Sequence, residues 1–387
     1  MRAPLRLLHT GDWHWGLVSW KESPRSVDRN PEIRKALDEI YEYAFSNKPD
    51  CILICGDLFN HYVAPSENDA KEVLSRIIEF SKIAPVAIVL GNHDWRGLAT
   101  YNPFSSRMGI YILSTLGEEP LEAIENLRLY YFPYFSLRNL LKKFQVSELQ
   151  DRAREFLSIY KNKYKSFSRL DRWNILLGHF SVEGVSYQNE ITFSSEFFVP
   201  KDFLSSELFD YAALGHIHSQ RRIPGASVPS YYCGSLVRVG FGEENNTVGA
   251  LWVELRDGEG VKVDPISVSS KPLKTFKLSV SEIVGLKDLL KSYEEDAYIR
   301  VIIDISGGTT FSPSYYINNV FSMDERIVKV VLERERAREE KKIATLRNKG
   351  LVEIFEEYLK MRGIQSPSLL EKFKNYYERV EREDEAS

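Results

Sequence analysis

Five short segments of this chain share one pattern: a run of apolar residues, then a small residue, then Asp, Asn or His. The five segments are Leu5–His14, Ile52–Asp57, Val86–Asp94, Asn174–His179 and Ala212–His218. Each therefore presents side chains that bind metal ions directly after an apolar run. Carboxylate, amide and imidazole donors drawn from several segments are typical of a site that holds two metal ions and hydrolyses a phosphate ester.

Taken alone, each segment has a plain structural explanation. Gly-Asp is common in turns, and a single His after a strand is commonly a hydrogen-bonded structural residue. The chain has seven His residues, however, and five of them lie at the ends of the apolar runs: His14, His93, His179, His216 and His218. Turn residues exposed to solvent have no reason to be His so consistently. We therefore expect the five segments to form one site.

The apolar runs must be strands for this site to form. Each run is short and rich in branched residues, as a buried strand is. Between the first three runs, Pro31–Asn47 and Glu67–Lys82 have apolar residues at helical spacing. Alternating strands and helices predict a layered α/β domain. In such sheets ligands bind at the carboxyl edge of the strands, which is where all five segments deliver their polar side chains.

The residue types suggest how two ions could be shared. Asp12 and His14 are predicted to lie on the same side of an extended backbone and to chelate one ion. Asp57, alone in its turn, is suited to bridging. We expect one ion to be bound by Asp12, His14, Asp57 and His218, and the other by Asp57, Asn92, His179 and His216. Mixed imidazole and carboxylate donors suit Mn²⁺, Fe or Zn²⁺ better than Mg²⁺.

His93 lies beside the ligand Asn92 but is expected to point to the opposite side of the chain. This placement makes His93 the candidate that protonates the leaving oxygen or stabilises the transition state. Asp94 is expected to orient the His93 ring. The alternative is that His93 is a further metal ligand.

Composition limits the classes of protein that are possible. The chain has 387 residues, 43% of them hydrophobic, and a net charge of −4, so it is long enough for two or three domains and is not a polycation. No apolar run is long enough to span a membrane. The chain begins almost directly with a strand, and we expect a cytoplasmic protein without a signal peptide. Cys51 and Cys55 lie on one face of a strand and are expected to be core residues.

A basic stretch runs from Arg138 to Arg172. It could contact nucleic acid, but a solvated helix face is the interpretation that we favour.

The rest of the chain divides by pattern. We expect a first domain over residues 1–270, a small α+β module over 271–332, a charged linker over 333–342 and a helical pair over 343–387. In the module, strands are predicted at Lys274–Val280, Tyr298–Ile305 and Ile327–Leu332, with a helix at Ser281–Ser292 whose N-cap is Ser281.

The C-terminal helical pair carries two apolar stripes, formed by Leu351, Phe355, Leu359, Leu370, Phe373, Tyr377 and Val380. Two helices of this size bury little surface alone. They must either pack on the main body or dock on another protein.

The five motifs, in this order, resemble the calcineurin-like metallophosphoesterase superfamily and, within it, the SbcD-type (Mre-type) nucleases of double-strand-break repair. Finer features that carry the second resemblance are Thr10–Gly16, Gly56–Phe59, Leu214–His218, Cys233–Ser235 and Phe241–Glu243. The module and the C-terminal helices match that family's DNA-capping domain and ATPase-binding segment by position.

The resemblance implies a layered sandwich of two β-sheets flanked by helices. It implies manganese-dependent exonuclease and endonuclease activity on DNA ends with two bound ions, a homodimer, and a partner that is an SbcC-type ABC ATPase with coiled coils. Because the chain has no phosphate-binding loop of the Gly-x-x-x-x-Gly-Lys-Ser/Thr type, ATP hydrolysis is expected from the partner. Relatives often carry a His shortly after the Gly-Asp motif; here the order is Asn60-His61, and no role is assigned to His61.

Two other functions stay open from the sequence. A phosphoesterase of the same fold could act on cyclic nucleotides, phosphoproteins or small phosphodiesters, because the metal site reads only a phosphate. An inactive phosphoesterase fold could instead serve as a scaffold, although the complete ligand set speaks against it.

Overall fold

The computed structural model describes residues 1–61, 63–135, 149–167, 170–185, 198–307 and 312–334, together with 352, 355, 356, 358, 359, 366 and 368–374. The chain forms two units. One comprises Met1–Ile303 and Thr309–Leu332, and the other Asp304–Gly308 and Glu333–Ser387.

The first sheet has six strands in the order β15-β14-β1-β4-β5-β6. Their bounds are β1 Leu5–Thr10, β4 Cys51–Ile54, β5 Val86–Val89, β6 Ile110–Leu113, β14 Gly249–Arg256 and β15 Gly260–Ser267. Strands β1, β4, β5 and β6 are parallel, and β14 joins β1 antiparallel. Three of the five motifs therefore follow neighbouring parallel strands, β1, β4 and β5.

The second sheet has five strands in the order β12-β13-β11-β8-β7. Their bounds are β7 Leu127–Phe132, β8 Trp173–His179, β11 Tyr211–Gly215, β12 Arg221–Arg222 and β13 Ser230–Tyr232. Strands β7, β8, β11 and β13 are parallel. The other two motifs end the adjacent strands β8 and β11.

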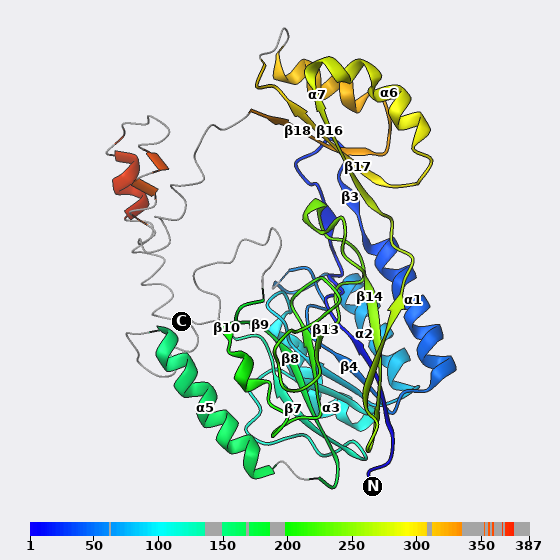
Figure 1. Cartoon of the computed structure of the whole chain (residues 1–387), viewed down its shortest axis with the longest axis vertical. Helices are drawn as coiled ribbons and strands as arrows, with labels where there is room; N and C mark the ends of the chain where they lie inside the picture. The colour runs from blue at the N-terminus through cyan, green and yellow to red at the C-terminus, as the bar shows by residue number, and fades with distance from the viewer. Residues whose placement is uncertain are drawn as a thin grey trace. The chain divides into compact units, whose positions relative to one another are not determined.

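A core of apolar side chains lies between the two sheets. Leu53 and Val89 of the first sheet and Ile175 and Leu177 of the second belong to this one buried cluster. The opposite face of the first sheet is covered by α1 (Asn30–Asn47) and α2 (Glu67–Ser81), and that of the second by α5 (Leu149–Phe167) (Figure 1). The predicted layered α/β fold, with two sheets flanked by helices, is confirmed.

The helices predicted at Pro31–Asn47 and Glu67–Lys82 are found within one residue of their expected bounds. Helix α2 begins after Ser66, whose hydroxyl accepts a hydrogen bond from the Asp69 amide. The short helical elements η1 (Arg96–Tyr101), α3 (Asn102–Ser105) and η2 (Ser106–Met108), which precede β6, were not predicted. Other short elements are β2 Val18–Ser19, β3 Val27–Asp28, β9 Ser181–Val182, β10 Phe198–Val199, η3 Lys201–Phe203 and η4 Phe241–Glu243.

The module at residues 271–332 contains a three-stranded sheet in the order β16-β17-β18, formed by Leu273–Ser279, Tyr298–Asp304 and Ile327–Glu333. Its helix α6 (Ile283–Ser292) follows the 3₁₀ turn η5 (Val280–Glu282). The predicted N-cap Ser281 is wrong, because Ser279 and Glu282 form a capping box that begins two residues earlier. A second helix, α7 (Pro313–Phe321), was not predicted. The boundary at residue 270 stays a prediction, and this module, apart from Asp304–Gly308, belongs to the same unit as the two sheets.

The second unit includes the predicted C-terminal helices. Among its described residues, the Phe355 and Phe373 rings stack with centroids 4.0 Å apart, and Leu359 is buried. Leu370 is half-buried. The other residues of the predicted stripes, Leu351, Tyr377 and Val380, lie outside the described residues.

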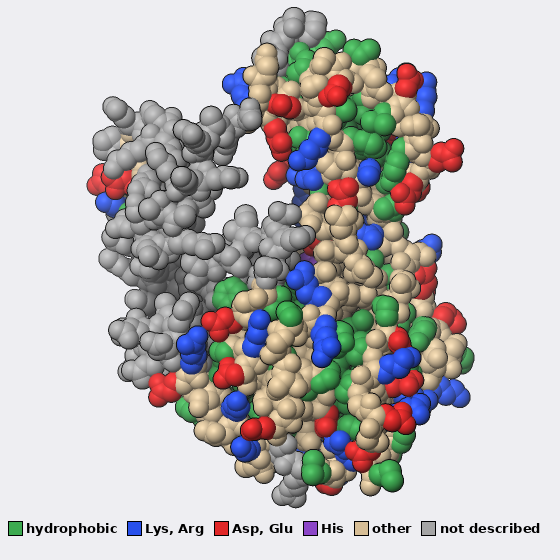
Figure 2. Space-filling model, in the orientation of Figure 1, with side chains coloured by type: hydrophobic (Ala, Val, Ile, Leu, Met, Phe, Trp, Pro, Cys, Tyr) green, Lys and Arg blue, Asp and Glu red, His purple; other side chains and the backbone are tan. Residues whose placement is uncertain are grey.

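The basic stretch falls partly on α5, and three of its described basic residues form ion pairs. Arg154 pairs with Glu183, Lys163 with Glu118 and Lys165 with Glu207 at 2.7–3.3 Å. On the face in Figure 2, basic and acidic side chains of the described residues are interspersed. The described part of the chain contains no helix that is long and apolar enough to cross a membrane.

Candidate metal centre

The first two motifs run side by side after their strands end. The amides of Asp12, His14 and Trp15 donate to the carbonyls of residues 56, 57 and 58 at 2.8–2.9 Å. The expected extended backbone at Asp12 and His14 is wrong: both have a left-handed conformation, with φ of 48° and 50°. Such backbone is costly for residues with a side chain and is found mainly where surrounding structure enforces it, as in functional sites.

The repeated pattern contains a small residue for a steric reason. A Cβ atom at Gly91 would collide with the Asp57 carboxylate, and one at Gly56 would lie 2.8 Å from Nδ1 of His179. Glycine at these positions lets one strand end approach the candidate ligand side chains of another.

The candidate ligands form two groups. In the first, Nε2 of His14 lies 2.9 Å from Nε2 of His218, and donor atoms of Asp12, His14 and His218 all lie within 4.8 Å of one another. The Asp12 carboxylate accepts a hydrogen bond from the His216 amide, which belongs to the other sheet, at 3.0 Å. The structure thus brings together the side chains predicted for one ion.

The second group is centred on Asn92. Its Oδ1 atom lies 3.0 Å from Nε2 of His179 and 3.2 Å from Nδ1 of His216. The other ring nitrogen of His179 donates to the Cys55 carbonyl at 2.6 Å. These are the side chains predicted for the second ion.

Asp57 lies between the two groups. Its Oδ2 atom is 3.8 Å from Nε2 of His14 and 3.5 Å from Nε2 of His179, while Oδ1 accepts the His93 amide at 2.8 Å. Burial alone would raise the pKa of the Asp57 carboxyl, but the neighbouring imidazoles lower it below its usual value. The group is therefore an anion placed to face both sets of ligands.

The protonation of His179 shows why a cation fits here. Burial lowers the pKa of His179 to about 4, so its ring is neutral at pH 7. Because Nδ1 donates to a carbonyl, the Nε2 atom carries the lone pair, and this lone pair faces the Asn92 oxygen. Two acceptors held at 3.0 Å favour a positive ion between them. Burial also raises the pKa of Asp12 to about 8, and a bound cation would oppose this shift.

His93 lies beside these ligands. Its Nδ1 donates to the Asn60 carbonyl at 3.0 Å, and its ring centroid is 5.2 Å from that of His14. A donor atom of His93 also lies within 4.8 Å of donor atoms of His14 and Asp57, so the geometry is compatible with a ligand as well as with an acid. His61 is exposed.

The expectation that Asp94 orients the His93 ring is wrong. The Asp94 carboxylate is buried and accepts backbone amides of Asp57, Leu58 and Gly91 at 2.7–2.9 Å. Asp94 therefore fixes the turn that carries Asp57, while the Asn60 carbonyl holds the His93 ring.

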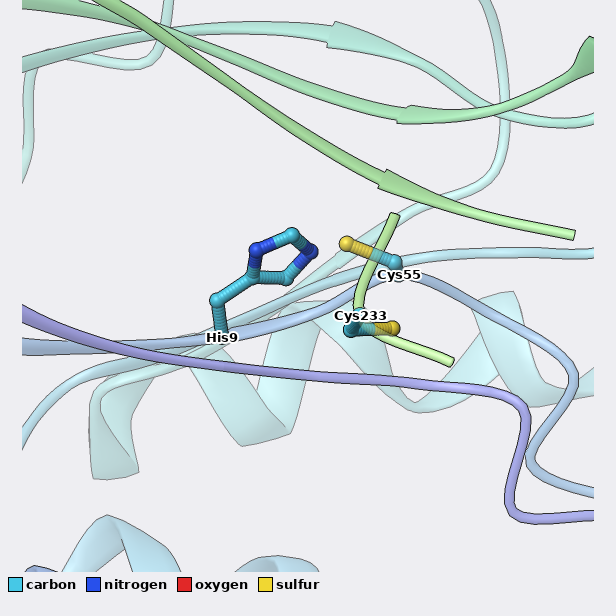
Figure 3. A group of neighbouring side chains, drawn as sticks. All are labelled: His9, Cys55 and Cys233. Carbon is cyan, nitrogen blue, oxygen red and sulfur yellow. The ribbon is translucent and has the colours of Figure 1, made fainter. Parts of the chain in front are cut away.

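A second group of buried donors lies outside this site. His9, Cys55 and Cys233 have donor atoms within 4.8 Å of one another and are fully buried (Figure 3). Both ring nitrogens of His9 are already engaged, with the Tyr211 hydroxyl at 2.9 Å and the Leu214 carbonyl at 3.2 Å. The predicted core role of Cys55 fits this environment, and Cys51 is likewise buried.

One residue at the centre was not predicted from the sequence. Glu243 accepts a hydrogen bond from Nδ1 of His218 at 2.7 Å. The available signal was its place in the Phe241–Glu243 motif, which contains none of the predicted ligands.

Residues 5–220 match the calcineurin-like phosphoesterase family, and the chain belongs to this family. The chain is 24% identical to a subunit of the nuclease SbcCD from Staphylococcus epidermidis over 71% of its length and 72% of that protein. It is 26% identical to the corresponding SbcCD subunit from Bacillus subtilis, over 78% and 80% of the two chains. It is also 24% identical to the DNA double-strand break repair protein Mre11 of Aeropyrum pernix, over 72% and 64%. These matches support a metal-dependent phosphodiesterase.

Proposed function

We propose that this protein is a two-metal nuclease that cleaves phosphodiester bonds at DNA ends as an exonuclease and endonuclease. The observation that carries the proposal is the position of Asp57 between two groups of donors whose lone pairs converge. The similarity of the chain to SbcCD nuclease subunits and to a break-repair protein selects DNA among the phosphodiesters that such a site could hydrolyse.

In this proposal two divalent ions, most naturally Mn²⁺, bind at the centre. Asp12, His14, Asp57 and His218 would hold one, and Asp57, Asn92, His179 and His216 would hold the other. Ions held in this way polarise the phosphoryl group and activate a water molecule. The set of nitrogen and oxygen donors suits Mn²⁺ better than Mg²⁺, which prefers oxygen ligands.

His93 is assigned the proton transfer. Since its Nδ1 donates to the Asn60 carbonyl, Nε2 is the nitrogen left to exchange a proton with the leaving oxygen. The same hydrogen bond fixes the orientation of the ring. Asp94 contributes by holding the turn that carries Asp57.

The proposal includes partners. The bacterial relatives are single subunits of a nuclease complex, and an SbcC-type ABC ATPase with a coiled coil is the partner that we infer for this chain. Binding would use the C-terminal helical pair, through Leu351, Phe355, Leu359, Leu370, Phe373, Tyr377 and Val380. The module at residues 271–332 would act as the DNA-capping domain, and the nuclease would be a homodimer.

Cleavage of end-labelled duplex DNA tests the proposal. Blunt duplexes labelled separately at each 5′ end are incubated with the protein and either Mn²⁺ or Mg²⁺. We expect cleavage that is faster with Mn²⁺ and absent in Asp57→Asn. Asp38→Asn is the matched control. It removes an exposed carboxylate of α1 that pairs with Arg76 of α2, and such a surface ion pair contributes little to stability.

Two outcomes would replace this function. Equal turnover of cyclic nucleotides and duplex ends would favour a small-phosphodiester hydrolase. Full metal content without cleavage of either DNA or a bis-aryl phosphodiester would favour a scaffold.

A further inference from the structure

Glu243 lies outside both ligand groups, and its carboxylate bonds the ring of the candidate ligand His218. Its Oε1 atom lies 2.7 Å from Nδ1 of His218, and its Oε2 accepts the Val239 amide at 2.8 Å. Both side chains of the His218–Glu243 pair are 15% exposed, so water competes only weakly for this contact. Both carboxylate oxygens of Glu243 are therefore fixed.

The turn that carries Glu243 is held from the side of the module at residues 271–332. Phe241 is buried in a cluster with Leu273 and Val328 of the module. Glu244, the next residue, accepts the amide and the hydroxyl of Thr275 at 3.1 and 2.6 Å. One short turn thus contacts the module on one side and a candidate metal ligand on the other.

The contact also determines which nitrogen of His218 is available. A carboxylate only accepts, so Nδ1 of His218 carries the proton and Nε2 carries the lone pair. This Nε2 atom is the one that lies 2.9 Å from His14, in the first ligand group. Carboxylates that accept from the second nitrogen of a ligating His fix its tautomer and raise the basicity of the ligand atom.

We propose that Glu243 is a positioning residue of the metal centre, which aims Nε2 of His218 at the ion held with Asp12 and His14. This inference rests on the proposed function, because it requires His218 to be a ligand. Glu243 acts through His218 and does not itself bind the ion.

The test is Mn²⁺ binding to full-length Glu243→Gln, followed by electron paramagnetic resonance and calorimetric titration. We expect one of the two ions to bind about 10–100-fold more weakly, the usual effect of losing such a partner, and the other to bind as in the wild type. The melting temperature of the metal-free variant should be unchanged. A purely structural role would instead lower that temperature and leave both affinities unchanged, which would overturn the proposal.

Glu244→Gln is the matched control, because it lies in the same turn but contacts Thr275 and not His218. Both ions should bind to it with wild-type affinity. An equal loss in both variants would trace the effect to disturbance of the turn and would overturn the role of Glu243.

His218→Gln separates failure of this inference from failure of the proposed ligand set. It should lose the same ion that is weakened in Glu243→Gln. If His218→Gln loses one ion while Glu243→Gln binds both normally, Glu243 has no positioning role and the ligand set stands. If His218→Gln binds both ions with wild-type affinity, the ligand set is wrong and the inference falls with it.

Discussion

The two sheets contribute different chemistry to one centre. The six-stranded sheet supplies Asp12, His14, Asp57 and Asn92, and the five-stranded sheet supplies His179, His216 and His218. All the negative charge in the candidate ligand set therefore comes from the first sheet, while the second contributes only imidazoles. We expect cation affinity to depend mainly on the carboxylates of the first sheet, and the position of the ions to depend also on the imidazoles of the second.

Each sheet also holds candidate ligands of the other. The Asp12 carboxylate accepts the amide of His216, and the His179 ring donates to the carbonyl of Cys55. The carboxylates are thus fixed by backbone donors and the imidazoles by acceptors. The centre is complete only where the two sheets meet, although each strand end is an ordinary local feature of its own sheet.

The largest effect is expected from removing charge on the first sheet. Asp57→Asn keeps the side-chain shape but loses the anion between the two groups. We expect metal content to fall and cleavage to drop by more than the roughly 10²–10³-fold that loss of one electrostatic group costs. Elemental analysis and DNA cleavage measure this, with Asp38→Asn as the control. Two full equivalents of metal in an active Asp57→Asn protein would contradict the assignment.

Substitution of His93, which follows a strand of the first sheet, distinguishes metal binding from the cleavage step. His93→Gln should retain both ions, because His93 is assigned to proton transfer and not to ligation. Cleavage should slow by about 10²–10⁴-fold, the usual contribution of a positioned acid. Metal content and single-turnover rates check this on one preparation. Loss of an ion from this variant would instead make His93 a ligand.

The difference between carboxylates and imidazoles predicts a pH dependence. Burial raises the pKa of Asp12 to about 8, so at lower pH a proton must leave before the ion binds. His179, with a pKa lowered to about 4 by burial, is neutral throughout this range and does not compete. Mn²⁺ affinity should therefore fall with falling pH from about 8, by up to about tenfold per pH unit for each proton released. Titrations in buffers of different ionisation enthalpy count the protons; a flat affinity would exclude this role for Asp12.

The smallest effect on cleavage is expected from a deletion at the C-terminal end of the chain, which follows both sheets in the sequence. Deletion of residues 343–387 removes the predicted helical pair, whose Phe355 and Phe373 rings stack on each other. Mn²⁺-dependent cleavage should be largely retained, while co-purification with the ATPase should be lost, because helices in a groove commonly bury such apolar faces. If the helices instead stabilise the phosphoesterase, the truncated protein will melt earlier and still bind the partner.

The strand ends could be predicted from the sequence because the spacing and type of apolar residues within a strand can be seen in a short stretch of sequence. Branched apolar runs before Asp57, Asn92 and His179 indicate buried strands, and parallel strands share one carboxyl edge. The left-handed backbone at Asp12 could not be predicted, since it depends on hydrogen bonds to a segment more than forty residues away. The role of Asp94 could not be predicted for the same reason: its carboxylate accepts amides of Asp57 and Leu58, which are distant in the sequence.

A contact between distant segments explains why Glu243 was not predicted, and ambiguous local patterns explain the errors in the module. The Glu243–His218 contact joins residues that are 25 positions apart, and no periodicity marks it. The capping box at Ser279 was missed by two residues, because both Ser279 and Ser281 are suitable N-caps by type. Helix α7 is only nine residues long, which leaves little periodicity to detect.

The central claim is that Asp57 joins two ions in one centre. Low-temperature electron paramagnetic resonance during Mn²⁺ titration of the wild-type protein tests it most directly. We predict that the second equivalent converts the spectrum of isolated Mn²⁺ into that of an exchange-coupled pair, and that Asp57→Asn never shows the coupled spectrum. Two fully loaded sites that keep the spectrum of isolated ions would contradict the claim.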